Sequence, residues 1–372
     1  MPMKNTDNVN HGSRMVQKTK DLISIIFLSL VSLLSLTFCI GLLLTNASLK
    51  RQVDASRSEL DAIESEGYYT TAQAEKLVQS VESKAKEEAL DEIRESFRES
   101  INEKGSLYAI REMFPNNLIV ASGGEYRFYP IDESIEKNMF SSDDFSLDDK
   151  GWLEYSGNNS EVNTFNGVQV SRYQKEVDFE KVKQSGIDFV MLRAGLRGTS
   201  EGTILEDDYF KTNIKNASSA GLDIGIYFES AAVDEAEAKE EAEFVLELIS
   251  DYEITYPIAI LAQPAESDDS RTAQLAPGDY SRIIDTFCKV IEDAGYKSII
   301  YGNILSFTEL VDKSELADRN VWISYSGEKQ YYPYRFDLWE YTKMGVVDGI
   351  DGSANLIISV TDFKTNESEV EE

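Results

Sequence analysis

The N-terminal part of the chain contains one long apolar stretch. From Leu22 to Leu44 the sequence runs for 23 residues without a charged side chain. A helix needs about 20 apolar residues to cross a bilayer, so the stretch predicts a transmembrane helix over residues 21–45. A cleaved signal peptide is the alternative, but its apolar region usually has about 7 to 15 residues. Basic residues before the stretch predict a cytoplasmic tail over residues 1–20 and a single-pass cell-membrane protein whose C-terminal part is extracellular.

Residues 46–104 follow a helical pattern without proline. Apolar side chains recur at spacings of three, four and seven, and most other positions hold Glu, Lys, Ala or Ser. The heptads are interrupted near Gly67 and contain few leucines, so the pattern predicts either a solvated helical stalk or a coiled coil that joins two chains as a homodimer. We favour the stalk. At 1.5 Å per residue, about 35 helical residues would hold the next segment about 50 Å from the bilayer.

The pattern changes twice in the rest of the chain. Prolines and glycines divide residues 105–166 into short aromatic stretches, which predicts a small connector that contains β-strands. Over residues 167–363, short β-branched and aromatic runs alternate with helical stretches, which is typical of a parallel sheet covered by helices. About 200 residues is short for an eight-unit barrel, which usually takes about 250, so we expect some helices to be missing or very short. Residues 364–372 predict a disordered acidic tail.

Composition narrows the possible partners. The chain has 42% hydrophobic and 28% charged residues, which is a globular composition, and its 36 basic and 67 acidic residues give a net charge of −31. Such a charge repels a phosphate backbone, so we expect no nucleic-acid partner. The chain has two cysteines, Cys39 and Cys288, and one histidine, His11, so neither a disulfide framework nor a zinc site nor a histidine-based triad is indicated. We expect neither a metal nor a cofactor.

Several motifs follow one another in order along the C-terminal segment. They include Gly167-Val-Gln-Val-Ser-Arg-Tyr-Gln174, Arg193-Ala-Gly-Leu-Arg-Gly198, Gly225-Ile-Tyr-Phe228 and Trp339-Glu-Tyr-Thr342. This series resembles family 25 glycoside hydrolases, the lysozyme or N-acetylmuramidase group, and in particular membrane-anchored cell-wall members. The resemblance implies an α/β fold, a modified (β/α) TIM-like barrel over residues 167–363, an extracellular setting and a muramyl-glycan ligand.

The resemblance also places the family's acidic residues at the ends of barrel strands. In this sequence the four matching positions are occupied by Gln169, Leu261, Gln263 and Asn355. Glycoside hydrolysis needs one carboxylic acid to protonate the leaving oxygen and a second carboxylate on the other side of the bond. An amide has no proton to give near neutral pH, although it still forms hydrogen bonds with sugars. We therefore expect a pseudoenzyme that binds peptidoglycan or a related wall glycan.

Two other functions remain open. Glu229 and Glu340 lie near strand ends and would form a relocated carboxylate pair in an active muramidase. The competing interpretation is that Glu229 pairs with an arginine such as Arg193. The third alternative is a protein interaction scaffold at the cell wall, in which the groove has lost sugar binding.

Candidate glycan contacts combine the amide positions with aromatic residues and one arginine. Aromatic faces at a barrel mouth are natural platforms for sugar rings, but the same side chains also fill barrel interiors. We favour a site role for Trp339, while Arg193 is either a ligand contact or part of a structural ion pair. The full set is Gln169, Arg193, Tyr227, Gln263, Tyr301, Trp322, Trp339, Tyr341 and Asn355.

Overall fold

The computed structural model describes residues 9–65, 71–261, 263, 265, 267, 269–312, 317, 319–327 and 329–364. Some side chains within residues 9–47, and that of residue 64, also lie outside the description. The predicted acidic tail, apart from residue 364, and residues 1–8 of the predicted cytoplasmic tail lie outside it too. The chain divides into two compact units, Met1–Met113 and Phe114–Glu372, which are described separately.

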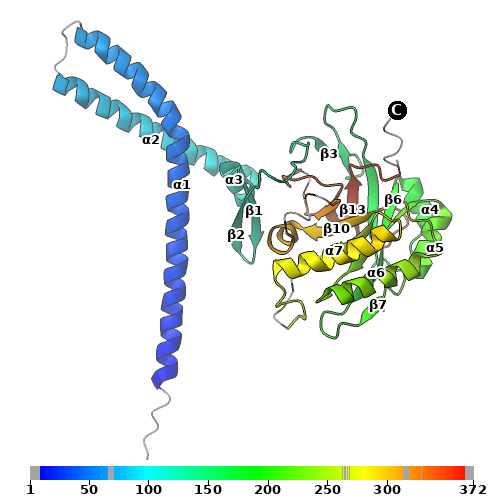
Figure 1. Cartoon of the computed structure of the whole chain (residues 1–372). Helices are drawn as coiled ribbons and strands as arrows, with labels where there is room; N and C mark the ends of the chain where they lie inside the picture. Colours follow the sequence, from blue (N-terminus) through cyan, green and yellow to red (C-terminus); the bar gives the residue numbers. More distant parts are fainter. Residues whose placement is uncertain are drawn as a thin grey trace, which may run out of the picture. The chain divides into compact units, whose positions relative to one another are not determined.

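The first unit is helical. It consists of α1 (Val9–Ser65), α2 (Thr71–Lys104) and α3 (Ser106–Met113), and Figure 1 shows all three. Large apolar side chains of α1 between Leu22 and Leu36 are exposed. Within the described residues, however, no helix combines the length and the apolar character of a membrane span. The structure therefore does not support the transmembrane helix predicted over residues 21–45.

The stalk predicted over residues 46–104 is not one extended helix. α2 packs against α1, with Ile93 of α2 next to Gly41 of α1, and Leu49 and Leu60 of α1 are buried. Many of the apolar positions that give the segment its helical periodicity are thus at least partly covered within one chain, whereas Leu77 and Ile101 are exposed. The expected spacer of about 50 Å is wrong for this arrangement, because a helical hairpin returns along its own length. The homodimer stays a prediction.

The second unit starts with residues that the sequence assigns to the connector. β1 (Asn117–Ser122) and β2 (Glu125–Pro130) form an antiparallel hairpin whose turn, Gly123-Gly124, has positive φ at both residues, as tight hairpin turns require. A second small hairpin joins β3 (Phe145–Leu147) to β4 (Leu153–Tyr155). The hydroxyl of Tyr331 accepts a bond from the Ile119 amide at 2.6 Å, which links the first hairpin to the barrel.

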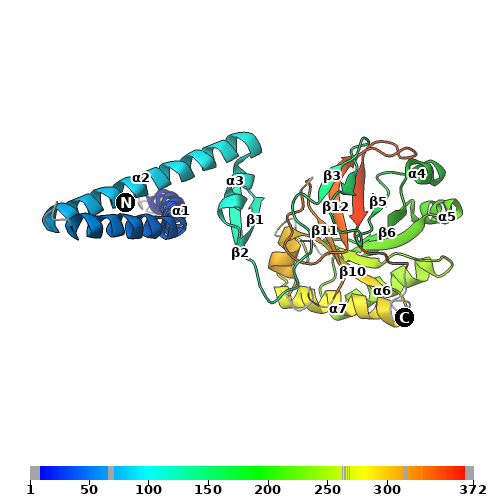
Figure 2. The same cartoon turned by 90° about the horizontal axis from the view of Figure 1, so that it is seen from above.

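The centre of the second unit is a closed barrel of eight strands, seen from a second direction in Figure 2. Neighbouring strands are parallel except at β13, which pairs antiparallel with both β12 and β5, and pairing of β5 with β6 closes the barrel. A short ninth strand, β7, extends the sheet from β6. The strands are β5 (Phe165–Val170), β6 (Phe189–Arg197), β7 (Ile204–Glu206), β8 (Asp223–Glu229), β9 (Ile258–Leu261), β10 (Ser298–Asn303), β11 (Val321–Ser324), β12 (Leu338–Gly345) and β13 (Ala354–Ser359).

Among the elements that the structure describes in full, four helices and one π-helical turn connect the strands, which agrees with an α/β barrel. They are α4 (Phe179–Ser185), α5 (Phe210–Ala220), α6 (Glu235–Ile249), α7 (Pro277–Asp293) and η1 (Ser306–Leu310). Asp178 and Asp234 cap the N-termini of α4 and α6 by accepting backbone N–H bonds. Among the described residues, no helix connects β11 to β12 or β12 to β13.

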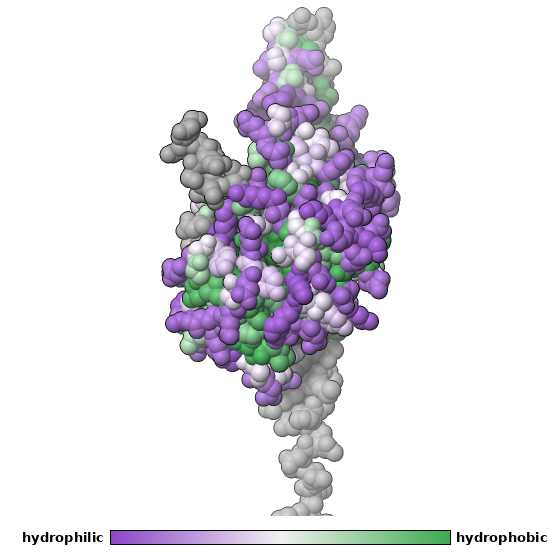
Figure 3. Space-filling view, turned by 90° about the vertical axis from the view of Figure 1, so that its right-hand side faces the viewer, coloured by the Kyte–Doolittle hydropathy of each residue, from purple (hydrophilic) through white to green (hydrophobic). Residues whose placement is uncertain are grey.

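The barrel has two apolar layers. Alternate strand residues point outward to the helices or inward to the barrel axis, because side chains alternate along a strand. The inner layer contains Phe189, Met191, Tyr256 and the stacked pair Tyr301 and Trp322, whose ring centroids are 3.8 Å apart. The face drawn in Figure 3 is mostly hydrophilic with limited hydrophobic areas. Toward the C-terminal ends of the parallel strands, polar residues replace the apolar inner layer, and the candidate site lies there.

Candidate functional site

A small hollow of about 180 Å³ lies at the C-terminal ends of the barrel strands. Barrel enzymes and binding proteins place their chemistry at this end, because loops from several strands converge there. The hollow collects most of the residues that the sequence assigns to the site. Its lining is Gln169, Ser171, Tyr173, Gln174, Arg193, Tyr227, Glu229, Leu261, Gln263, Tyr301, Lys343 and Asn355.

Hydrogen bonds join four inward-facing side chains at the base of the hollow. Asn355 of β13 faces Gln169 of β5 in the strand register, and its Nδ2 donates to Gln169 Oε1 at 2.6 Å and to Glu340 Oε2 at 3.0 Å. The hydroxyl of Tyr301 also donates to Glu340 Oε2, at 2.7 Å. Burial, and then the nearby Glu340 carboxylate, raise the pKa of Tyr301 well above its usual value, so its hydroxyl remains a neutral donor.

Glu340 is almost completely enclosed. Its side chain is 1% exposed, and its second oxygen accepts a bond from Ser324 Oγ at 2.7 Å and lies 3.8 Å from Lys343 Nζ. With Tyr301 and Asn355 on the first oxygen, both carboxylate oxygens are occupied. Glu340 therefore acts as the acceptor that holds three strands' side chains in place, and it is not among the residues that line the hollow.

Arg193 forms a second polar group on another wall of the hollow. Its guanidinium pairs with the buried Asp207 at 2.7 Å and with Glu229 at 2.8 Å, and it lies over the ring of Tyr173 at 5.4 Å. Burial alone lowers the pKa of Arg193, but Tyr227, Glu229 and Asp207 outweigh burial and raise it above its usual value. The proposed pairing of Glu229 with Arg193 is confirmed. Because Glu229 is still 36% exposed, this carboxylate is the one that a ligand in the hollow would meet.

The remaining predicted positions complete the wall. Leu261 is buried at the end of β9 beside Glu229 of β8, whereas Gln263 is exposed. Tyr227 is buried, and burial followed by the nearby Glu229 raises its pKa, so it is also uncharged. The hollow thus presents neutral hydrogen-bonding groups, one arginine, one lysine and one paired carboxylate.

Three aromatic residues predicted as glycan contacts lie elsewhere. Trp322 is fully buried in the inner layer of the barrel, where it stacks on Tyr301. Trp339 and Tyr341 alternate with Glu340 along β12 and therefore face outward, where Trp339 packs edge-on against Phe145 and the Tyr341 hydroxyl accepts a bond from the Leu153 amide. The assignment of these three side chains to glycan contacts is corrected, because all of them are buried away from the hollow.

Five residues of the site were not predicted, and one of them is Lys343 near the end of β12. Ser171, Tyr173 and Gln174 belong to the same motif as Gln169, so the motif held enough information to find them. Asp207 lies just after β7 and reaches Arg193 because β7 turns back antiparallel on β6. Nothing in the local sequence around Asp207 indicates this return. Among the described residues, no group of three His, Cys, Asp or Glu side chains is placed to hold a metal ion.

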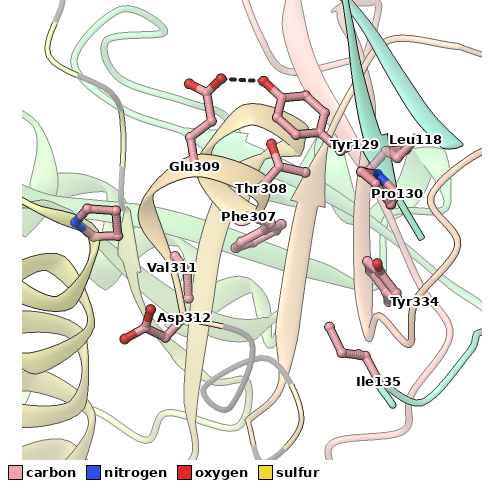
Figure 4. Close-up of a pocket in the computed structure, with 11 residues that line it drawn as sticks. Leu118, Tyr129, Pro130, Ile135, Phe307, Thr308, Glu309, Val311, Asp312 and Tyr334 are labelled. Atoms are coloured by element: carbon pink, nitrogen blue, oxygen red, sulfur yellow. Dashed lines mark hydrogen bonds between the residues drawn. The ribbon is translucent and has the colours of Figure 1, made fainter. Parts of the chain in front are cut away.

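A larger hollow of about 500 Å³ lies between the β1–β2 hairpin and the segment that contains η1 (Figure 4). Its walls are mainly apolar, including Leu118, Ile135 and Phe307. Glu309 on its rim accepts bonds from the Tyr129 hydroxyl and, at 2.8 Å, from Arg127. Both contacts use one oxygen of the carboxylate and connect the hairpin to the barrel, so we assign this region a structural role.

Comparison with known sequences identifies the barrel. The family model described as "Glycosyl hydrolases family 25" matches residues 168–350, which extend from the second half of β5 into the β12–β13 connection. The chain contains a glycoside hydrolase family 25 domain. The match includes Gln169, Arg193, Glu229, Leu261, Gln263 and Glu340, and Asn355 follows it by five residues.

Individual relatives share only part of their length with this chain. The "Autolytic lysozyme" of Clostridium acetobutylicum is 27% identical over 191 residues, which cover 51% of this chain and 54% of the relative. The "Uncharacterized protein YegX" of Escherichia coli K12 is 25% identical over 199 residues, 51% of this chain and 67% of the relative. The solved structure of the modular autolysin LytC from Streptococcus pneumoniae in complex with a synthetic peptidoglycan ligand has a TM-score of 0.47 and 21% identity, covering 65% of this chain and 56% of that one. The chain thus spans about half the length of the clostridial relative.

Proposed function

We propose that the family 25 domain binds peptidoglycan or a related wall glycan in the hollow without hydrolysing it. One observation carries the proposal: all three carboxylates of the site are already engaged, and the first of them, Asp207, is bonded to Arg193. Glu340 is enclosed by Tyr301, Asn355, Ser324 and Lys343, and Glu229 pairs with Arg193. The four positions that the family resemblance assigns to acids carry two glutamines, a leucine and an asparagine.

The chemistry of glycoside hydrolysis explains why this arrangement favours binding over cleavage. A general acid must reach the leaving oxygen, and a second carboxylate must stand about 5 to 9.5 Å away to attack the sugar or activate water. Glu340 is 1% exposed, so a substrate in the hollow would not contact it without rearrangement of β12 and β13. Glu229 is bonded to Arg193 at 2.8 Å, so this oxygen is already occupied where a general acid would have to reach the leaving oxygen.

The same side chains are suited to holding a sugar. Gln169 and Gln263 supply amide donors, and Gln263 and Asn355 supply amide acceptors, for hydroxyl and acetamido groups. Tyr173 offers an exposed aromatic face beside Arg193. Lys343 adds a positive charge at the edge of the hollow. The name of the clostridial relative, an autolytic lysozyme, supports a wall polymer as the ligand class, although the chain spans only 54% of that protein.

The test combines binding and cleavage in one preparation. Purified full chain is incubated with insoluble peptidoglycan, the bound fraction is measured by sedimentation, and released reducing ends are measured in the supernatant. Binding without reducing ends is the expected result. Reducing ends that disappear in Glu229→Gln or Glu340→Gln would instead establish a muramidase with relocated carboxylates, and absence of both binding and cleavage would favour the protein interaction scaffold.

The proposal includes a location at the outer side of the cell membrane. It rests on the 23 uncharged residues from Leu22 to Leu44 and on the basic residues before them. Cell fractionation tests it: the full chain should remain with membranes after alkaline carbonate washing, while a Leu30→Arg, Leu34→Arg double variant should be released. Recovery of both proteins in the soluble fraction would contradict the anchor.

A further inference from the structure

Exposed apolar side chains of the second unit gather beside the hollow. Among its described residues, seven large hydrophobic side chains are exposed, and three of them, Leu147, Met344 and Val346, line a single groove of about 390 Å³. A fourth, Tyr173, lines the hollow itself. Met344 is 76% exposed and Val346 is 75% exposed. A cluster of exposed apolar residues on a soluble domain marks a binding surface more often than isolated ones do.

The groove and the hollow are neighbours on strand β12. Lys343 lines the hollow, while the residues on either side of it, Thr342 and Met344, line the groove. The pairing of β12 with β13 is irregular at two points between Glu340 and Gly345. Such irregularities change the direction of side chains, and here they bring Lys343 to the hollow and leave Met344 in solvent. A ligand that extends from the hollow past Lys343 would have to cross β12 to reach the groove on its other face.

The opposite wall of the groove is rigid. Trp152 is buried, and its indole N–H donates to the Val346 carbonyl at 3.4 Å, so the two sides of the groove are joined. The carboxylate of Asp148 accepts bonds from the amides of Lys150 and Trp152, which fixes the β3–β4 turn that supplies this wall. The groove is therefore formed before any ligand binds, which reduces the entropy cost of binding.

Charge distinguishes this groove from most of the molecule. Lys343 and Lys150 flank it in a chain with a net charge of −31. Glu340, the carboxylate nearest to Lys343, is already bonded to three neutral donors at 2.7 to 3.0 Å, whereas Lys343 lies 3.8 Å away and is exposed. Small apolar contacts flanked by lysines are complementary to a ligand that carries methyl groups and carboxylates.

We propose that this groove, defined by Leu147, Trp152, Met344 and Val346 and bordered by Lys343 and Lys150, binds the short peptide attached to the wall glycan. The inference rests on the proposed binding of wall glycan in the hollow. Wall peptides are rich in alanine methyl groups and free carboxylates and branch from the sugar backbone. These features match an apolar groove that is separated from a sugar-sized hollow by one strand and is bordered by a lysine. The protein thereby selects peptide-bearing glycan over bare glycan.

The experiment compares two forms of one polymer. Full chain is titrated against insoluble peptidoglycan with its peptides intact and against the same material from which an amidase has removed the peptides. We expect roughly tenfold tighter binding to the intact polymer, about the effect of one or two well-packed apolar side chains. A Met344→Ser, Val346→Ser double variant should lose this preference and bind both forms as the wild type binds the stripped polymer. Lys343→Ala should weaken binding to the intact polymer in a salt-dependent manner.

A matched control comes from the same unit. Met139 is 66% exposed and does not line the groove, so Met139→Ser removes an equally exposed methionine without touching the proposed surface. This variant should keep the full preference, and unfolding temperatures of all variants should match the wild type because the changed side chains are exposed. Equal binding of both polymers by the wild type would contradict peptide binding in the groove and would leave the proposed glycan binding intact. Failure to bind either polymer would overturn the proposed function and the groove with it.

Discussion

Two arginines on strand β6, four residues apart, have nearly identical surroundings and different roles. Arg193 pairs with the buried Asp207 and the partly exposed Glu229, while Arg197 pairs with the buried Glu241 and the exposed Glu240. Both guanidinium groups are almost completely buried. Only Arg193 reaches the hollow, because the pairing of β6 with β8 shifts register between Arg193 and Gly195.

The register shift places Arg193 and Arg197 on opposite faces of the strand. Without it, residues 193 and 197 would point to the same side, since side chains alternate with a period of two. The irregularity turns Arg197 outward to α6, where it also donates to the carbonyls of Gly202 and Glu237. A buried ion pair therefore does not by itself indicate a site. The difference lies in whether one of its carboxylates faces a hollow.

Replacing either arginine should have the largest effect on stability, and only one of the two replacements should also affect binding. Arg193→Ala and Arg197→Ala each leave a buried carboxylate without its partner, and each should lower the free energy of unfolding by about 3–5 kcal/mol. Only Arg193→Ala should also abolish binding to peptidoglycan, measured by sedimentation at a temperature where both variants are folded. Lys239→Ala, on the exposed face of α6, serves as the control and should change stability by less than about 0.5 kcal/mol. Loss of wall binding in Arg197→Ala would erase the distinction between the two ion pairs.

The next largest effect is the pH dependence of stability, which comes from Glu241, the buried partner of Arg197. Burial raises the pKa of the Glu241 carboxyl from 4.5 to about 7, and Ser230 and Arg197 offset burial only in part. Between these values the folded protein holds a proton that the unfolded chain has lost, so stability decreases as pH rises from about 4.5 to about 7, by roughly 3 kcal/mol. Chemical denaturation at several pH values should show this slope in the wild type, and the slope should be absent in Glu241→Gln. A wild type whose stability rises over the same range would contradict the assignment.

Glu340→Gln should have an intermediate effect. A glutamine keeps one acceptor oxygen but points its NH₂ group at donors, either at Tyr301 and Asn355 or at Ser324 and Lys343. An unsatisfied donor of this kind costs about 1–3 kcal/mol of stability. Thermal unfolding measures the loss, and binding to peptidoglycan should weaken because the base of the hollow loses its order. A variant with wild-type stability would show that Glu340 does not hold the strands together.

Glu229→Gln should have the smallest effect. The ion pair with Arg193 is partly open to solvent, and pairs of this kind contribute up to about 1 kcal/mol. Arg193 keeps its buried partner Asp207, so the unfolding temperature should change little. Titration with peptidoglycan should show a change in affinity of less than about fivefold. A strong loss of binding would mean that the negative charge of Glu229, and not the neutral amides, provides most of the affinity for the ligand.

The sequence predicted the barrel well because its physical requirements are local. Parallel strands that are buried on both faces appear as short apolar runs, and the alternation of such runs with helical segments predicts a parallel sheet covered by helices. The closure of this sheet into a barrel was implied by the family resemblance. The site positions Gln169 and Asn355 could be found because each lies in a recognisable motif, and the structure then shows them opposite each other on adjacent strands.

The errors arise where the answer depends on which face of a strand a residue occupies. In Leu338-Trp339-Glu340-Tyr341 both faces of β12 are buried, so the apolar pattern does not show which side chains point inward. Tyr341 and Trp339 were placed in the site although they cover the outer wall, and Glu340 is the inward residue. The fold-back of α2 on α1 was missed for a related reason, because helical periodicity indicates a buried face without identifying its partner.

The β1–β2 hairpin has a mechanical consequence. It is the first sheet element after the chain enters the second unit at Phe114, and β1 pairs only with β2. Tension applied along the backbone from the N-terminal side would load this six-residue ladder and the side-chain bonds of Tyr331 and Glu309 before it reached the closed barrel. Under mechanical force the hairpin would thus unfold first, while the barrel and its hollow kept their folded structure.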